Sequence, residues 1–122
     1  MIGLGIDAID IGRFRALLAR RPALAARLFT DDERAYAHRR ADPAPSLAAR
    51  FAAKEAAMKA LGVGLGAFGW KDVEVVTSLT GRPSLSVRGA AAVLADDQGV
   101  ENWQVSLTHT ESLAQAVVAA LR

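Results

Sequence analysis

The sequence predicts a small α+β domain in which an antiparallel sheet packs against helices. Segments with alternating apolar residues, typical of strands, occur near both ends of the chain, and an alanine-rich segment with helical periodicity lies in the middle. The chain has 122 residues, of which 52% are hydrophobic, and this length suits one buried core. We therefore expect a single domain over residues 1–122.

The first strand is expected over residues 2–7. Ile2, Leu4 and Ile6 alternate there with two glycines and then Asp7. One face of this strand lacks side chains until Asp7, and we therefore expect another segment to approach its backbone closely.

Three helices are expected next. Apolar residues at helical spacing predict a helix from Ile11 until Pro22. The second helix begins with the capping box Thr30-Asp31-Asp32-Glu33. The third is the alanine-rich helix, for which Ser46 can act as the N-cap and Gly62, in the left-handed conformation, can close the C-terminus.

The second half is expected to be richer in strands. Two alternating segments joined by a Gly-Arg-Pro turn predict a hairpin, a short helix follows, and two more alternating segments are joined by a polar turn. The expected elements are strands over residues 71–77, 84–87, 103–108 and 113–120, and a helix over residues 89–98.

The alanine-rich helix carries charges close to its apolar face. Four apolar residues form one stripe at about 100° per residue. Lys54 falls within that stripe, and Glu55 lies at its edge beside Lys59. An ammonium group and a carboxylate are therefore aimed near the core. The stripe consists of Leu47, Phe51, Met58 and Leu61.

A first candidate site pairs Glu55 with Asp7. Buried carboxylates are costly unless something pairs with them. Because the chain has no cysteine and only two histidines, carboxylate oxygens favour Mg²⁺ over zinc, and Mg²⁺ typically uses one or two carboxylates together with substrate phosphates. The spacing leaves an alternative open, in which Glu55 pairs with Lys59 and Asp7 caps the following helix.

Two further groups could bind an anion. Residues 62–69 are rich in glycine and follow the helix that bears Lys54 and Lys59, so their N–H groups could cradle a phosphate. Glycines after a helix are, however, most often a C-cap and a turn. The strand end Ser106-Leu107-Thr108-His109-Thr110 groups hydroxyls with an imidazole, which suits anion binding or proton transfer. Taken singly, His109 would by default be a structural residue.

Charge and composition limit which partners the protein could bind and in which cellular compartment it could work. The net charge is only +2, yet residues 11–30 hold five arginines and no acidic residue, so we expect an acidic partner there. The absence of cysteine, of an apolar run of ~18 residues and of a signal peptide favours a soluble cytoplasmic protein without a membrane partner. The five arginines are Arg13, Arg15, Arg20, Arg21 and Arg27.

Three motifs together resemble those of the holo-acyl-carrier-protein synthases. Residues 5–14 resemble the opening Gly-Ile-Asp motif of that family, Arg50-Phe51-Ala52-Ala53-Lys54-Glu55-Ala56 resembles its signature helix, and residues 106–110 resemble its closing motif. Phe29-Thr30 with Glu33, and Gly81-Arg82-Pro83, are also similar. The likeness runs from Ile2 to the last strand in the family's order. Val63 departs from the pattern, which usually has Thr there.

The resemblance implies the 4'-phosphopantetheinyl transferase fold and its activity. In that family a carrier-protein serine attacks the β-phosphate of coenzyme A, 3',5'-ADP leaves, and the apo acyl carrier protein becomes the holo form. The resemblance also implies a place in fatty acid biosynthesis and lipid metabolism, and a homotrimer with coenzyme A in clefts between subunits.

The matching motifs also imply roles for individual residues. Asp7 and Glu55 would bind Mg²⁺ and, with Lys59, take part in catalysis. The acidic carrier protein would dock on the arginine run, at Arg13, Arg20 and Arg21. Coenzyme A would be held by Arg50, Lys54, Lys59, Gly62, Gly64, Ser106, His109 and Thr110.

Two other classes of protein compete with this interpretation. A pI near 9.5 would suit a basic nucleic-acid-binding module without catalytic activity, but the aromatic residues, four Phe, two Trp and one Tyr, are dispersed without a stacking motif. A purely structural trimeric protein would leave Lys54 and Glu55 without a purpose.

Overall fold

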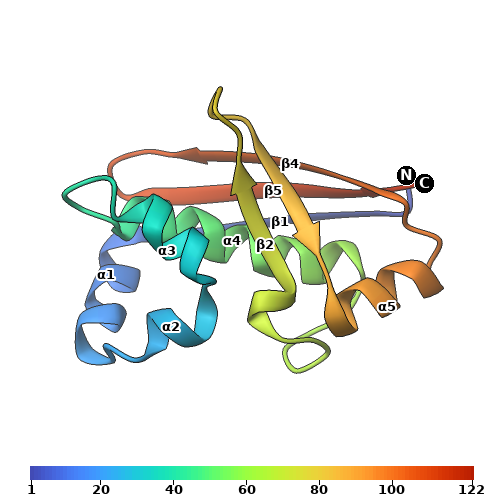
Figure 1. Cartoon of the computed structure of the whole chain (residues 1–122), viewed down its shortest axis with the longest axis horizontal. Coiled ribbons are helices and arrows are strands. Elements are labelled where there is room, and N and C mark those ends of the chain that lie inside the picture. Colours follow the sequence, from blue (N-terminus) through green and yellow to red (C-terminus); the bar gives the residue numbers. More distant parts are fainter.

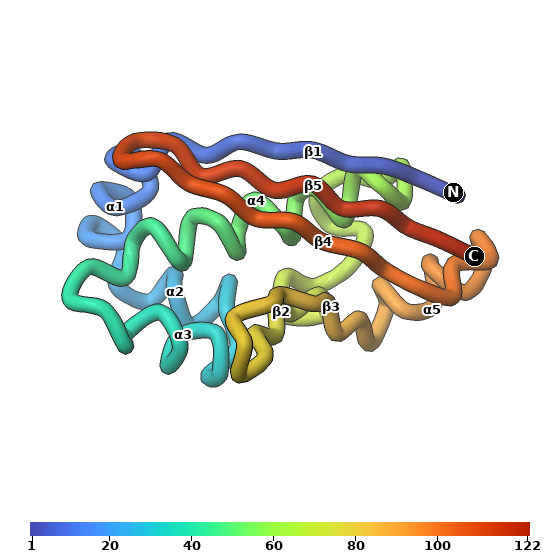
Figure 2. The backbone as a smooth tube through the Cα atoms, turned by 90° about the horizontal axis from the view of Figure 1, so that it is seen from above, coloured from blue at the N-terminus to red at the C-terminus, as the bar shows by residue number.

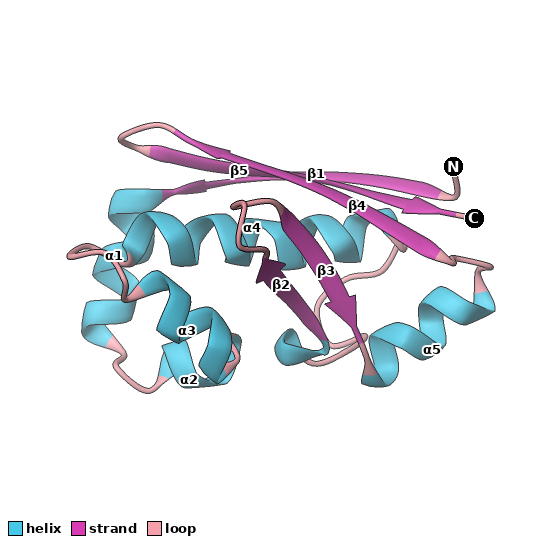
Figure 3. Cartoon of the chain, turned by 45° about the horizontal axis from the view of Figure 1, so that its top comes forward, coloured by secondary structure: helices cyan, strands magenta, loops and turns pink.

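The structure, a computed structural model, describes all residues from 1 to 122. The long helix α4 (Ala44–Ala60) lies beneath a three-stranded sheet, and a two-stranded hairpin crosses in front of the helix (Figure 1). The helices before α4 gather at one end of the molecule, and the helix that follows the hairpin lies at the other end, as Figure 3 shows. The remaining elements are β1 (Gly3–Asp10), α1 (Ile11–Arg20), α2 (Leu24–Leu28), α3 (Asp31–Ala37), the 3₁₀ helix η1 (Trp70–Asp72), β2 (Val73–Thr77), β3 (Pro83–Val87), α5 (Gly89–Asp97), β4 (Asn102–His109) and β5 (Leu113–Leu121).

The three-stranded sheet is antiparallel in the order β1-β5-β4, so that β1 and β4 are its two edge strands (Figure 2). Alternate residues of β5 are buried on the face toward α4, as the period of a strand requires. The opposite face has no covering element. It is apolar along β1 and the middle of β5, but polar along β4, where Gln104 and Ser106 are exposed. Leu4 and Ile6 are each 58% exposed on this face, and Ile6 pairs with Val117, which is 38% exposed.

The glycines of β1 allow α4 to pack directly on the strand backbone. A Cβ atom on Gly3 would lie 1.8 Å from the carbonyl oxygen of Ala60, and one on Gly5 would lie 1.8 Å from that of Ala56. Both distances are far below van der Waals contact. The expected close approach to the bare face of this strand is therefore confirmed, and the segment that approaches is α4.

Replacing Gly5 by Ala should destabilise the protein by at least about 3 kcal/mol, because the new methyl group meets backbone that cannot rotate away. Urea unfolding followed by circular dichroism measures the loss. Gly12→Ala is the matched control, since Gly12 lies exposed in α1, where alanine should add up to about 1 kcal/mol through helix propensity. Equal stability of the two variants would contradict the packing of α4 on β1.

The helix termini confirm part of the expectations. The capping box of α3 is present, because Thr30 Oγ1 accepts from the Glu33 N–H and Glu33 Oε1 accepts from the Thr30 N–H. Gly62 follows α4 with a φ of 70°, as expected. The prediction that Ser46 caps α4 is wrong. The helix begins at Ala44, because prolines are tolerated in a first turn whose N–H groups have no intrahelical partner.

Two strand boundaries differ from the expectation by more than one residue. The first strand continues to Asp10, three residues further than its glycine pattern indicates, because it pairs along its whole length with β5. The strand expected from residue 71 begins at Val73, because residues 70–72 form a 3₁₀ turn in which Asp72 accepts from the Gly69 N–H at 3.1 Å. None of the helices is both long and apolar enough to cross a membrane.

Candidate active site

Asp7 and Glu55 meet where β1 lies on α4. Asp7 follows Gly5 on the same face of the strand, and Glu55 precedes the Ala56 carbonyl that lies against Gly5. Lys59 stands one helical turn beyond Glu55, and its Nζ donates to the Ile6 carbonyl at 2.9 Å and to Asp7 Oδ1 at 3.1 Å. The close contact of strand and helix thus assembles two carboxylates and one ammonium group.

The two carboxylates affect one another's protonation. Burial raises the pKa of Glu55, the neighbouring Asp7 carboxylate raises it further, and Lys59 partly opposes the shift. The second oxygen of Asp7, Oδ2, is buried and has no hydrogen-bond partner. A carboxylate oxygen without a donor beside a second carboxylate is a suitable set of ligands for a hard cation.

The donor set limits which cation could bind. No group of three or more His, Cys, Asp or Glu side chains is placed to hold a metal ion. A cation at Asp7 and Glu55 would therefore have two protein ligands, and water or phosphate oxygens would complete its coordination. Mg²⁺ tolerates this arrangement, whereas a structural zinc site needs four protein ligands.

The structure does not show the simpler roles that sequence spacing allows, in which Asp7 caps α1 and Glu55 pairs with Lys59. Asp10, and not Asp7, caps α1, because Asp10 Oδ1 accepts from the Arg13 N–H at 2.8 Å. Lys59 forms its ion pair with Asp7, and not with Glu55. Glu55 consequently has no ion-pair partner in the protein, whereas Asp7 is paired through one of its two oxygens only.

A small hollow of about 160 Å³ adjoins this group, between the end of α4 and the glycine-rich loop. The N–H of Gly62 donates to the Lys59 carbonyl, and that of Val63 donates to the Met58 carbonyl. The N–H groups of residues 64–66, in contrast, donate to no protein acceptor. Three free consecutive donors beside Glu55 and Lys59 could hold phosphate oxygens. The hollow is lined by Glu55, Met58, Lys59, Val63, Gly64 and Leu65.

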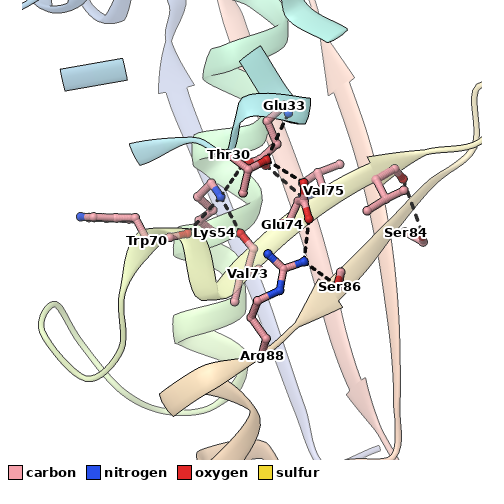
Figure 4. A network of polar contacts seen from close by, with 11 residues as sticks. Thr30, Glu33, Lys54, Trp70, Val73, Glu74, Val75, Ser84, Ser86 and Arg88 are labelled. Atoms are coloured by element: carbon pink, nitrogen blue, oxygen red, sulfur yellow. Dashed lines mark hydrogen bonds and ion pairs between the residues drawn. The ribbon is translucent and has the colours of Figure 1, made fainter. Parts of the chain in front are cut away.

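Lys54 does not face this hollow, which corrects the expectation that it contacts coenzyme A. Its side chain is fully buried, and its Nζ donates to Glu33 Oε1 at 2.8 Å and to the carbonyls of Trp70 and Val73 (Figure 4). An ammonium group has three donors, and all three are engaged. Burial lowers the pKa of Lys54, although Glu33 opposes this shift. Lys54 therefore belongs to the core.

A second cleft, of about 370 Å³, lies at the end of β4. Arg50 forms its inner wall and is 4% exposed. Its guanidinium donates to Ser46 Oγ and Thr77 Oγ1, both at 2.8 Å, and lies 4.4 Å from the centre of the Tyr36 ring. Arg50 Nε has no partner. Burial lowers the pKa of this arginine, which still remains cationic because its ordinary pKa is so high. The cleft is lined by Tyr36, Arg40, Asp42, Pro45, Ser46, Ala49, Arg50, Leu107, Thr108 and His109.

The strand-end motif contributes only in part to this cleft. His109 lines it and is exposed. Ser106 and Thr110 lie outside its lining, and Thr110 Oγ1 instead accepts from the N–H groups of Ser112 and Leu113 in the turn. Sequence reasoning missed Tyr36 and Arg40; the only tyrosine and the basic run around it were the signals that could have found them.

The structure separates the two halves of the expected site. Asp7 lies on β1 and His109 on β4, the opposite edge strands of one sheet. On α4, Glu55 and Arg50 are five residues apart, which turns them about 140° from each other around the helix axis. One chain therefore presents the carboxylate group and the arginine cleft on different sides.

The arginine run lies on the surface, as expected. Arg13, Arg20 and Arg21 are exposed, and none of them forms an ion pair. Arg15 alone is neutralised, by Asp42 at 2.6 Å, on the other side of α1. The face that carries Arg13 and Arg20 is thus uncompensated positive charge, which suits an acidic partner.

Comparison with known proteins gives consistent matches over the whole chain. The family model of the 4'-phosphopantetheinyl transferase superfamily matches residues 3–120. The holo-acyl-carrier-protein synthase of Streptomyces avermitilis is 49% identical over 98% of this chain and 97% of its own length.

Solved structures agree with these sequence matches. The crystal structure of the Neisseria meningitidis holo-acyl-carrier-protein synthase superposes with a TM-score of 0.89 at 29% identity, covering 100% of this chain and 99% of that one. The crystal structure of the Helicobacter pylori holo-acyl-carrier-protein synthase in complex with coenzyme A superposes with a TM-score of 0.84 at 27% identity. It covers 96% of this chain and 98% of that one. The alternative of a nucleic-acid-binding module is not supported by these matches.

Proposed function

Because the chain belongs to the 4'-phosphopantetheinyl transferase superfamily, we propose that it transfers the 4'-phosphopantetheine arm of coenzyme A to a serine of apo acyl carrier protein. The products are the holo carrier protein and 3',5'-ADP. The observation that carries the proposal is the group of Asp7, Glu55 and Lys59 beside free loop N–H groups. It lies in a chain that is similar over its full length to holo-acyl-carrier-protein synthases.

Phosphoryl transfer needs charge neutralisation and alignment. The serine hydroxyl loses its proton to water as its Oγ forms a bond to the β-phosphorus, the bond from that phosphorus to the bridging oxygen breaks, and 3',5'-ADP leaves with the electron pair. Lys59, held at 3.1 Å from Asp7, and the N–H groups of residues 64–66 would hold the non-bridging oxygens, where negative charge is concentrated. Mg²⁺, held by Asp7 and Glu55, would neutralise further charge on the phosphates.

We further propose that the site is completed between copies of this chain. The two half-sites lie at opposite edges of the sheet, so a ring of copies would bring the β4 edge of one chain to the β1 edge of the next. Such an assembly could also bury the apolar part of the outer face, at Leu4, Ile6 and Val117. A homotrimer is the ring that the family resemblance implies. Arg50 and His109 of one chain would then bind the 3'-phosphate of coenzyme A whose diphosphate lies at Asp7 of its neighbour.

Incubation with apo acyl carrier protein, coenzyme A and Mg²⁺ tests the proposed activity. Mass spectrometry should show the carrier gaining the mass of one phosphopantetheine arm. A carrier whose acceptor serine is replaced by alanine should gain nothing, and EDTA should stop the reaction. If the folded protein binds coenzyme A but modifies none of several apo carrier proteins, the proposed function is wrong.

Carrier docking is expected to depend on the exposed side of α1. Arg13→Glu combined with Arg20→Glu should raise the KM for apo carrier protein at least tenfold, roughly the loss expected when two attractive contacts become repulsive, with the KM for coenzyme A nearly unchanged. Added salt should weaken the wild type in the same direction, because exposed charges are screened beyond about 10 Å at 0.1 M.

Arg15→Glu is the matched control for this docking face. Arg15 lies on the other side of α1, where it pairs with Asp42, so reversing it should change the carrier KM much less although each reversal alters the net charge by the same amount. A similar rise in both variants would show that only the net charge matters. An unchanged KM in the double variant at low salt would remove the docking assignment.

A further inference from the structure

Lys54 and Glu33 form a fully buried ion pair at the centre of the molecule. Each side chain is 0% exposed, and the Nζ to Oε1 distance is 2.8 Å. Glu33 Oε1 also accepts from the Thr30 N–H, and Oε2 accepts from the Val75 N–H at 3.0 Å. Figure 4 shows how the bonds from this pair spread into α3 and β2. The ion pair therefore joins three segments that are distant in sequence.

One of these bonds holds the end of the glycine-rich loop. Lys54 Nζ donates to the carbonyl of Trp70 at 3.0 Å, and Trp70 is the first residue of η1, directly after residues 62–69. The Trp70 ring also packs on Phe51 of α4, with 4.9 Å between ring centres. The other end of the loop is held by Gln98, whose Nε2 donates to the Leu61 carbonyl at 2.8 Å. The loop that bears the free N–H groups is thus fastened at both ends.

Stability alone does not account for an ammonium group in this position. Taking two charges out of water costs several kcal/mol per ion, and well-packed apolar residues of similar volume are often as stable or more so. What a lysine adds is direction, because three donors on one atom must meet three acceptors at once. Here those acceptors lie on α3, η1 and β2, so the bonds tie one face of α4 to three other segments. Glu55 is the next residue on that helix.

We propose that Lys54 is a positioning residue: it fixes the rotation of α4 and the returning end of loop 62–69, so that Glu55, Lys59 and the loop N–H groups are aligned on the phosphates. This inference rests on the proposed transferase function. Lys54 itself touches neither phosphate nor metal, because its three donors are all engaged inside the protein.

The chain offers a matched pair of substitutions and an optical reporter. Lys54→Met removes the buried ammonium group, and Lys71→Met makes the same change at an exposed lysine next to Trp70. The protein has two tryptophans, so a Trp103→Phe background leaves Trp70 as the only one. Its emission maximum and its quenching by acrylamide then report the end of the loop without any turnover.

Lys54→Met should move the Trp70 emission to longer wavelength and increase its quenching, whereas Lys71→Met should change neither. In the folded Lys54→Met variant, kcat/KM should fall on the order of a hundredfold, the loss that misplacement by about 1 Å can cause. Much of this loss should be a raised KM for coenzyme A. A purely structural role would instead reduce the fraction of active enzyme, and so the apparent kcat, with an unchanged KM.

Because the chain has no cysteine, a cysteine introduced at position 54 is the only thiol. It can be alkylated selectively to restore the ammonium group. In unfolded Lys54→Cys, the thiolate attacks 2-bromoethylamine, a C–S bond forms and bromide leaves, which gives a side chain of lysine length. Alkylation with 1-bromopropane gives the same length without the charge. After refolding, the aminoethyl form should recover the wild-type KM and Trp70 emission, and the propyl form should not.

If Lys54→Met does not fold, the double variant Lys54→Met with Glu33→Gln is used instead. The double variant leaves no isolated buried charge, and the amide oxygen at position 33 can still accept from the Val75 N–H. A wild-type KM and wild-type Trp70 emission in either folded variant would overturn the positioning role. Transfer by the wild type tests the proposed function separately, because the fluorescence changes do not depend on turnover.

Discussion

Replacing Glu55 by Gln should reduce transfer by at least about a hundredfold, because the charge-neutralising group at a phosphoryl centre typically supplies several kcal/mol. The same change should raise the thermal unfolding temperature in EDTA near neutral pH. Burial and the neighbouring Asp7 carboxylate raise the pKa of Glu55, so the ionised form is unfavourable in the folded protein, and the neutral amide relieves that cost.

The sign of the pH dependence follows from that raised pKa. The folded protein holds the proton of Glu55 more tightly than the unfolded chain does. This contribution to stability is fully present below the ordinary pKa of glutamate, and it is lost as the pH rises through the higher pKa of the folded state. The advantage of Glu55→Gln in EDTA should therefore be absent near pH 4 and should grow toward neutral pH.

Mg²⁺ should make the wild type more stable than Glu55→Gln, the reverse of the order in EDTA, because the metal binds the deprotonated carboxylate. Added Mg²⁺ should raise the unfolding temperature of the wild type and leave that of Glu55→Gln nearly unchanged. Glu101→Gln, at an exposed glutamate in another part of the chain, should respond to Mg²⁺ as the wild type does. Equal stabilisation of Glu55→Gln and the wild type by Mg²⁺, or near-wild-type transfer in EDTA, would show that Glu55 is not a ligand.

Mixing two inactive variants should restore transfer if the site lies between subunits. Glu55→Ala damages the half-site at β1, and His109→Ala damages the half-site at β4. After mixed refolding in equal amounts, about one site in four should combine two intact halves, as random assembly of a cyclic oligomer with heterologous interfaces requires. We expect recovery of about a quarter of the wild-type rate from two proteins that are each nearly inactive.

A second pair of variants controls for this recovery. Glu55→Ala mixed with Asp7→Ala, two changes in the same half-site, should recover nothing. The His109→Ala protein should also lose more affinity for coenzyme A than for dephospho-coenzyme A if His109 contacts the 3'-phosphate. No recovery from Glu55→Ala with His109→Ala, in oligomers shown to be mixed, would place the whole site within one chain. An active mixture in the control would show that Asp7 and Glu55 do not belong to the same half-site.

The sequence alone determined the features that depend on local pattern. The two glycines of β1 predicted that another segment approaches the backbone of this strand closely. A strand face without side chains has nothing to bury in a core, but it leaves room for another backbone. The Thr30–Glu33 capping box and the position of Gly62 predicted the start of α3 and the end of α4. These features follow from short-range geometry, which repeats in any protein with the same spacing.

The tertiary structure alone decided which partners the charged residues of α4 meet. Periodicity places Lys54 on the apolar face, but only the packing of α3, η1 and β2 on that face supplies its three acceptors. The same holds for Arg50, whose partner Thr77 is 27 residues away. Helical periodicity gives the direction of a side chain, whereas its contacts depend on which distant segments cover that direction. For this reason Lys54 proved to be a core residue, and the two halves of the expected site proved to lie at opposite edges of one sheet.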